Sequence, residues 1–149
     1  MLERQISTYE DNRGSLTPLD CEGWEQVNVS YNKKKNTFRG MHYQTDPPQT
    51  KMVKVVKGRI VDFLYDLETK EVLQFDLSNQ QAVLVPDNYA HGFITLEDDT
   101  IVTYLVRGEY NPDSEHSIVW DTIPEIEETI NELINDSELV ISDKDLVGK

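Results

Sequence analysis

Two segments of this sequence combine histidine with basic and aromatic residues, a composition suited to proton transfer. The first is RGMHYQ at 39–44, which contains His42, and Lys51 follows it closely. The second is the YAHGF–TIVTY stretch at 89–104, which ends at Tyr104. Imidazole can remove a proton, a phenol can return one, and an ammonium group can stabilise a developing oxyanion. These residues are candidates for an enzyme that holds a base and an acid on opposite sides of a small carbon skeleton.

The cations near His42 bear on its protonation. Arg39 lies three residues before it, and Lys51 starts the next expected strand. Because a neighbouring positive charge disfavours a second one, we expect a neutral imidazole, which is what a general base near pH 7 requires. Strand context alone leaves a packing role open, both for His42 and for Tyr104.

Metal binding is the main chemical alternative for histidines in a small β-barrel. A usual signature has two histidines one residue apart, a glutamate shortly after them, and a third histidine on a later strand. Here Gln44 occupies the second position, His91 stands alone on its segment, and we expect His116 in a loop. The sequence therefore predicts a site without a metal or other cofactor.

Short β-prone runs separated by turn residues fill the middle of the chain. After an alternating run that starts in 24–38, they fall at 52–56, 59–67, 72–77, 82–85, 93–96 and 101–106. Tyr104 alternates with Val102 and Val106 in the last of these, so a regular strand would place all three on one face. This spacing predicts an all-β, antiparallel sandwich or barrel.

One helix is expected near the C-terminus. Thr122 and Glu125 match a capping box, and Pro124 falls in the first turn, where proline is tolerated. An apolar face follows, formed by Ile126, Ile130, Leu133 and Ile134. We expect the glutamates between these residues to form the solvated face.

Composition limits the function classes. The 149 residues, 38% of them hydrophobic, fit a single domain over 1–149. A net charge of −14 argues against a nucleic acid partner, and no apolar stretch is long enough to span a membrane. The first 14 residues lack the apolar region of a secretion signal. A single cysteine, Cys21, fits the reducing cytoplasm, and we expect it to be buried.

Several motifs occur in an order that is specific when taken together. They are DNRG at 11–14, QVNVS at 26–30, RGMHYQ at 39–44, Lys51, PDNYAHGF at 86–93, the Tyr104–Tyr110 spacing, SIVWD at 117–121 and ISDKD at 141–145. In these motifs the chain resembles the dTDP-4-dehydrorhamnose 3,5-epimerase family, over nearly its whole length. The resemblance implies a cupin-type jelly roll with a short C-terminal helix. It also implies a homodimer that acts without a metal on nucleotide-linked 4-keto-6-deoxy sugars.

The resemblance also assigns roles by motif position. His42 is similar to the family's proton acceptor, Tyr104 to its proton donor, and Lys51 to the lysine beside the 4-keto oxygen. Asp145, which on its own looks like an exposed tail residue, corresponds to the aspartate that pairs with the histidine. Further substrate-binding positions match Arg13, Gln26, Asn28, Arg39, His91, Glu115 and Lys144.

The implied activity is inversion of C3, C5 or both, in the biosynthesis of surface polysaccharides such as lipopolysaccharide. Three departures from the family pattern leave the substrate open. Pro18 replaces a glutamate that usually contacts the nucleotide, one extra residue separates the QVNVS motif from the RG of RGMHYQ, and a longer family segment is reduced to 68–73. The nucleotide, whether dTDP, GDP or CDP, and the choice between hexose and heptose therefore stay undetermined. The alternatives are a 3,4-ketoisomerase on the same fold and a non-catalytic sugar-binding domain, although the latter should have lost one of the four catalytic candidates.

Overall fold

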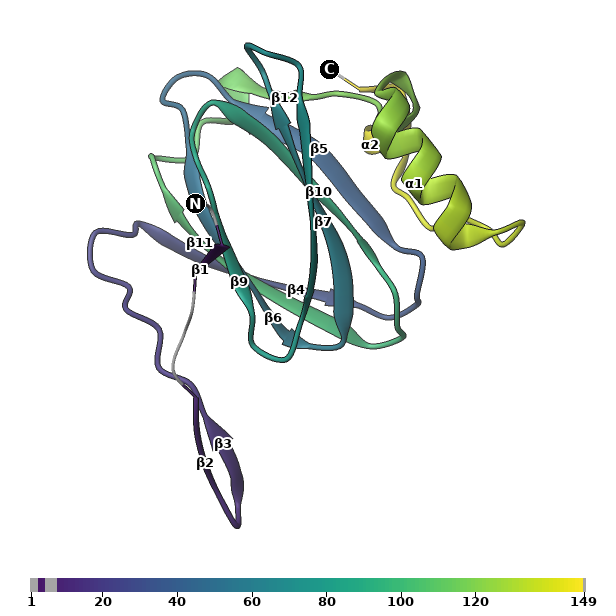
Figure 1. The fold of residues 1–149 in the computed structure, drawn as a ribbon. Coiled ribbons are helices and arrows are strands. Elements are labelled where there is room, and N and C mark those ends of the chain that lie inside the picture. Colours follow the sequence, from purple (N-terminus) through teal and green to yellow (C-terminus); the bar gives the residue numbers. More distant parts are fainter. Residues whose placement is uncertain (1–2, 5–7, 149) are drawn as a thin grey trace.

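Two five-stranded antiparallel sheets face each other in the part of the chain described by the computed structural model, residues 3–4 and 8–148 (Figure 1). The first sheet has the order β1 (Glu3–Arg4), β9 (Ala82–Val85), β6 (Thr50–Lys57), β11 (Thr100–Arg107) and β4 (Gln26–Asn32). The second has the order β12 (Glu115–Ser117), β5 (Phe38–Gln44), β10 (Tyr89–Thr95), β7 (Arg59–Asp66) and β8 (Val72–Ser78). Residues 1–2 and 5–7 belong to the N-terminal stretch in which we expect no secretion signal, and they lie outside the described residues.

The predicted β-prone runs all coincide with strands, which confirms the all-β class. The run at 93–96 covers only the end of β10, which begins at Tyr89 and includes His91, and none of these runs covers β5. The expectation that His116 lies in a loop is wrong, because it pairs with Tyr43 in the short strand β12. Three residues are too few for alternation to be recognised in the sequence.

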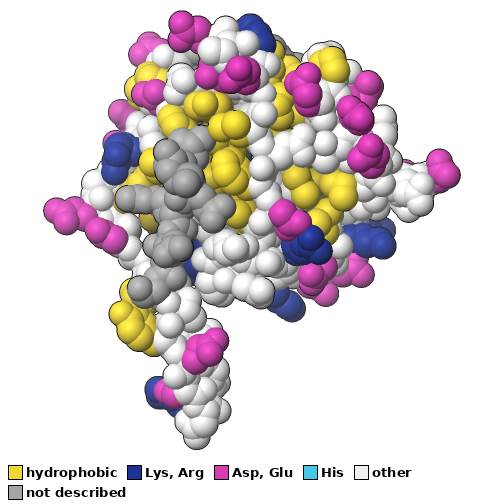
Figure 2. Space-filling view, in the orientation of Figure 1, with side chains coloured by type: hydrophobic (Ala, Val, Ile, Leu, Met, Phe, Trp, Pro, Cys, Tyr) yellow, Lys and Arg dark blue, Asp and Glu magenta, His cyan; other side chains and the backbone are white. Residues whose placement is uncertain are grey.

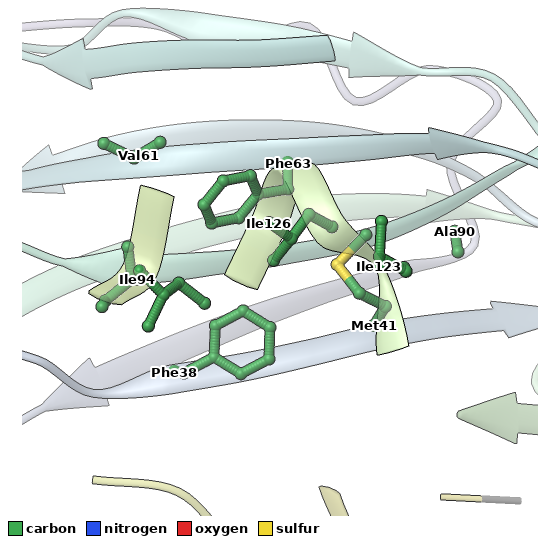
Figure 3. Packing of buried hydrophobic residues seen from close by; sticks show 9 residues of the cluster. Phe38, Met41, Val61, Phe63, Ala90, Ile94, Ile123 and Ile126 are labelled. Atoms are coloured by element: carbon green, nitrogen blue, oxygen red, sulfur yellow. The ribbon is translucent and has the colours of Figure 1, made fainter. Parts of the chain in front are cut away.

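Apolar side chains fill the space between the sheets and also cover the outer face of the second sheet. The inner cluster includes Val53, Val55, Leu64 and Val102, all fully buried. The outer cluster packs Phe38, Met41 and Phe63 around Ile126 (Figure 3). Each such side chain stabilises the fold by roughly 1.5–3 kcal/mol relative to an exposed position. The second sheet is therefore a rigid support, buried on both faces.

The helix α1 (Pro124–Ile134) provides the cover for that outer face (Figure 1). Pro124 lies in its first turn as predicted, but the capping box is wrong. Ile123 is the N-cap, and the Thr122 hydroxyl instead donates to the Val119 carbonyl at 2.6 Å within a 3₁₀ turn. Ile126 and Ile130 are buried, whereas Leu133 is 37% exposed and lies at the edge of the apolar face.

The C-terminal segment forms a second helix, α2 (Asp143–Val147), which the sequence does not predict. The Phe38 amide donates to the Val140 carbonyl at 2.8 Å, and the Val140 amide donates to the Asn36 carbonyl at 2.9 Å. These backbone hydrogen bonds fix the segment to the second sheet at the start of β5. Ser142 then caps α2 by accepting from the Asp145 amide at 3.2 Å. These contacts bring Asp145 to the middle of β5.

A hairpin of β2 (Tyr9–Asp11) and β3 (Gly14–Leu16) extends away from the sheets (Figures 1 and 2). Tyr9 and Leu16 pair across it and are 64% and 70% exposed. Cys21, in the connection to β4, is exposed, so its predicted burial is wrong. This connection lies outside both apolar clusters. Neither described helix combines the length and apolar character needed to cross a membrane.

Candidate active site

Glycines bring the two histidine-containing strands unusually close together. Gly40 in β5 has a φ of +137°, and a Cβ there would lie 2.6 Å from the Gly92 Cα in β10. A Cβ on Gly92 would in turn lie 2.8 Å from the Arg39 carbonyl oxygen. Because any side chain would force the strands apart, this approach requires glycine at both positions. It places His42 directly opposite His91 in the strand pairing.

A cavity of about 420 Å³ opens between the two sheets. Seven of the residues predicted from the sequence line it: Gln26, Asn28, Arg39, His42, Lys51, Tyr104 and Glu115. The second sheet contributes His42 through β5 and the first sheet contributes Tyr104 through β11. The cavity is thus bordered by a potential base and a potential acid from opposite sheets.

His42 is paired with a buried carboxylate. Its Nε2 lies 2.7 Å from Asp145 Oδ1, while Asp145 Oδ2 accepts from the Gly40 amide at 3.1 Å. Burial opposes ionisation of Asp145, but its interactions with His42, and to a smaller extent with the Gly40 amide and Lys144, outweigh this effect and lower the pKa of the carboxyl. Because a carboxylate can only accept, Nε2 carries the proton and the lone pair of the ring is on Nδ1.

Tyr104 is suited to donate a proton. Its side chain is half-buried in the cavity wall, and burial raises the pKa of the hydroxyl above its ordinary value. Glu115 also raises that pKa, whereas the positive charge of Arg39 opposes the shift. The phenol therefore stays protonated at neutral pH.

Lys51 supplies a cation from β6. Burial lowers the pKa of its ammonium group, and the negative charges of Glu115 and Asp62 partly offset this effect. An ammonium in such a partly desolvated site stabilises an oxyanion more strongly than one in water.

Polar contacts hold the remaining wall of the site. Arg39 Nε donates to Asn32 Oδ1 at 2.7 Å, and Gln26 Nε2 donates to Asn28 Oδ1 at 2.8 Å. Lys144 Nζ lies 2.5 Å from Glu115 Oε1, which joins α2 to β12. This ion pair raises the pKa of Lys144. The wall is therefore formed by both sheets, and the C-terminal helix is bonded to it through Glu115.

The sequence profile of the dTDP-4-dehydrorhamnose 3,5-epimerase family matches residues 5–149. The chain belongs to this family. Its resemblance to the family, inferred from the motifs, is thereby confirmed, and so is the isomerase class at the level of the family.

Individual relatives agree with this assignment. The dTDP-4-dehydrorhamnose 3,5-epimerase of Methanothermobacter thermautotrophicus is 33% identical, over 92% of this chain and 82% of that protein. The Neisseria gonorrhoeae epimerase is 30% identical over 81% of this chain, but this chain spans only 41% of its length. The crystal structure of the Bacillus anthracis enzyme, with TDP and PPi bound, superposes with a TM-score of 0.80 at 31% identity, covering 96% of this chain and 89% of that one. This likeness confirms the cupin-type jelly roll.

Three residues at family substrate-binding positions, His91, Arg13 and Lys144, lie outside the cavity wall. His91 is buried behind it and hydrogen-bonds through Nε2 to Asp62 Oδ1 at 2.6 Å. Arg13 lies on the projecting hairpin, with its side chain 86% exposed and paired with Asp11. Within one copy of the described chain, Arg13 is thus separate from the other site residues.

Some residues of the site were not predicted from the sequence. Tyr43, Gln44, Gln49 and Tyr110 also line the cavity. Asp62 was missed too, although a signal exists: it is an acidic residue within the apolar run of β7. Among residues 3–4 and 8–148 no group of three or more histidine, cysteine, aspartate or glutamate residues is arranged to hold a metal ion.

Proposed function

We propose that this chain is an epimerase that inverts one or both carbons adjacent to the carbonyl of a nucleotide-linked 4-keto-6-deoxy sugar. The observation that carries the proposal is the arrangement of the cavity. The His42–Asp145 pair and Tyr104 approach it from opposite sheets, and Lys51 lines it from β6, the strand next to that of Tyr104. A proton can thus leave one face of a carbon and return to the other.

The first step is removal of the proton next to the carbonyl by His42 Nδ1. The Asp145 carboxylate, already bonded to Nε2–H, stabilises the imidazolium that forms. The carbonyl oxygen becomes an enolate, and the Lys51 ammonium provides its counter-charge. The positive charge on His42 thus develops beside Asp145, and the negative charge on the substrate oxygen develops beside Lys51. The fold holds both partner groups in place before the reaction starts.

The second step is reprotonation by Tyr104. The hydroxyl keeps its proton until the enolate forms, because burial raises its pKa. Delivery from the face opposite His42 inverts the carbon and regenerates the ketone. The phenolate then recovers its proton from His42 or from water, which completes the cycle.

The nucleotide diphosphate is proposed to occupy the outer part of the cavity. Arg39 offers a guanidinium for bidentate phosphate contacts, and Gln26 and Asn28 offer amides. Tyr110 provides an exposed ring against which a base can stack. The TDP in the Bacillus anthracis structure supports a thymidine nucleotide. The reaction belongs, in this proposal, to a cytoplasmic pathway for surface polysaccharide.

A homodimer would complete the site. Arg13 does not line the cavity of its own subunit, and the hairpin that carries it exposes Tyr9 and Leu16. β4, at the end of its sheet, exposes Val27 and Val29, and natural proteins usually cover such edges. We propose that the hairpin crosses to a second subunit, where Arg13 binds the substrate diphosphate.

Incubation in deuterium oxide tests the proposed reaction. The enzyme is mixed with dTDP-, GDP- and CDP-linked 4-keto-6-deoxy sugars, and mass spectrometry counts the deuterons incorporated into each. One exchanged position indicates a single inversion and two indicate both, while NMR of the product shows where the carbonyl lies. A carbonyl moved from C4 would show a ketoisomerase, and absence of exchange with every substrate would contradict the proposal.

A further inference from the structure

Asp62 is a carboxylate in an unexpected environment. It lies on β7 between Ile60 and Leu64, which face the same way and belong to the apolar cluster between the sheets. All three residues are fully buried. Because an isolated charge is strongly disfavoured there, a carboxylate at this position needs specific partners.

One oxygen of Asp62 has such a partner and the other does not. Oδ1 is bonded to His91 Nε2 at 2.6 Å, and His91 itself is only 6% exposed. Oδ2 has no hydrogen-bond partner within the described residues, although it is inaccessible to solvent. A buried acceptor left unsatisfied destabilises the fold, so its presence calls for a function.

Lys51 is the cation for which this oxygen is suited. The side chain at Lys51 points between the sheets from β6, as those at Val53 and Val55 do. Glu115 and, with a smaller effect, Asp62 are the two negative charges that favour its ammonium form. Glu115 also bonds to Lys144. The interaction is mutual: burial raises the pKa of Asp62, and His91 and, to a smaller extent, Lys51 oppose this rise by favouring the ionised form.

We propose that Asp62, held in place by His91, is the positioning residue for Lys51. Its second oxygen keeps the lysine charged and directs the ammonium towards the substrate carbonyl. The catalytic part of this inference rests on the proposed function, whereas the pairing of Asp62 with Lys51 does not. The buried Asp62 carboxylate, which alone would destabilise the fold, thereby helps Lys51 to stabilise the enolate.

Other ionisable groups around Lys51 must be kept unchanged in a test. They are Arg39, His42 and Tyr43 from β5, His91 from β10, Tyr104 from β11, Glu115 from β12, and Tyr31 and Tyr110 elsewhere on the cavity wall. The strand paired with β6 on its other side, β9, contributes only Ala82–Val85, which are apolar. Asp62→Asn alters one charge and leaves all these groups in place.

The experiment follows Lys51 directly, by NMR titration of ¹³C-labelled lysine side chains in the free enzyme. The Lys51 signal is assigned by its loss in Lys51→Met. Asp62→Asn is expected to lower the Lys51 midpoint by about one pH unit or more, since a nearby opposite charge shifts a pKa by roughly 1–3 units. The control is Asp76→Asn, which removes an exposed carboxylate of β8 paired with Arg59. An unchanged Lys51 midpoint in Asp62→Asn would overturn the proposal, because that result is expected if Asp62 has only a structural role.

Activity separates this inference from the proposed reaction. The alkaline limb of the kcat profile should move to lower pH together with the Lys51 midpoint. If the Lys51 midpoint moves while the alkaline limb of the kcat profile stays unchanged, the pairing of Asp62 with Lys51 is supported and the catalytic role of Lys51 is contradicted. Should Asp62→Asn not fold, Lys51→Met tests the pairing from the other side. Loss of the ammonium should raise the Asp62 midpoint in carboxyl NMR, and an unchanged midpoint would refute the pairing.

Discussion

Replacing Asp145 with asparagine tests the base directly. The carboxylate accepts two hydrogen bonds, from His42 Nε2 and from the Gly40 amide. An amide of the same shape has only one oxygen for these two donors and no negative charge. One contact is therefore lost, and the imidazolium that forms during proton removal loses its counter-charge.

The magnitude follows from these contacts. A hydrogen bond to a charged group contributes about 1.5–3 kcal/mol, and each 1.4 kcal/mol corresponds to tenfold in rate. We therefore expect the rate constant of proton removal in Asp145→Asn to fall by about 10- to 150-fold. The assay is single-turnover deuterium exchange into the substrate, which reports proton removal without product release. The control is Asp143→Asn, which removes the same charge from an exposed position of the same helix.

The pH dependence of stability gives a second readout. The pKa of Asp145 in the folded protein lies below its ordinary value of 3.8. Its ionised form therefore stabilises the fold above that value, and the contribution is lost as pH falls through the lower, folded pKa. Denaturant unfolding should show Asp145→Asn less stable than the wild type at neutral pH by about 1–3 kcal/mol, with the difference shrinking in acid. Equal effects in Asp143→Asn, or wild-type exchange in Asp145→Asn, would refute the assigned role.

Further predictions concern the acid, metals and assembly. His42→Asn and Tyr104→Phe should each reduce epimerisation by about 10²–10⁴-fold with the fold intact by circular dichroism. Tyr104→Phe should keep part of its deuterium exchange, because His42 still forms the enolate, and equal loss of both activities would contradict separate roles. EDTA or added zinc should leave turnover unchanged, since Lys51 provides the counter-charge. One equivalent of metal per chain, with activity lost on chelation, would show this to be wrong. Mixing inactive Arg13→Ala with inactive His42→Asn should restore up to about a quarter of wild-type activity if subunits exchange and the site is shared. Heterodimers without recovery would exclude a shared site.

Alternation along the chain was sufficient to locate most of the longer strands, although not β5, and three of the four catalytic candidates lie in strands. His42, Lys51 and Tyr104 lie in β5, β6 and β11, within segments that the residue pattern indicates. The side-chain period of a strand is a local property, so the face on which Tyr104 lies can be read from Val102 and Val106. Likewise, Pro124 correctly marks the start of α1, because proline fixes its own backbone angle.

Burial and pairing between distant segments were decided by the tertiary structure. Taken by itself, Asp145 looks like an exposed tail residue, yet it is only 4% exposed, because Val140 bonds to the start of β5 and brings α2 against the sheet. The resemblance to the family assigned its role, but no local pattern links residues so far apart in sequence. Asp62 reads as one polar position in a strand until the sheets close around it and leave Oδ2 without a partner. Local pattern fixes which face of a strand a side chain occupies, whereas its partners depend on which segments pack against that face.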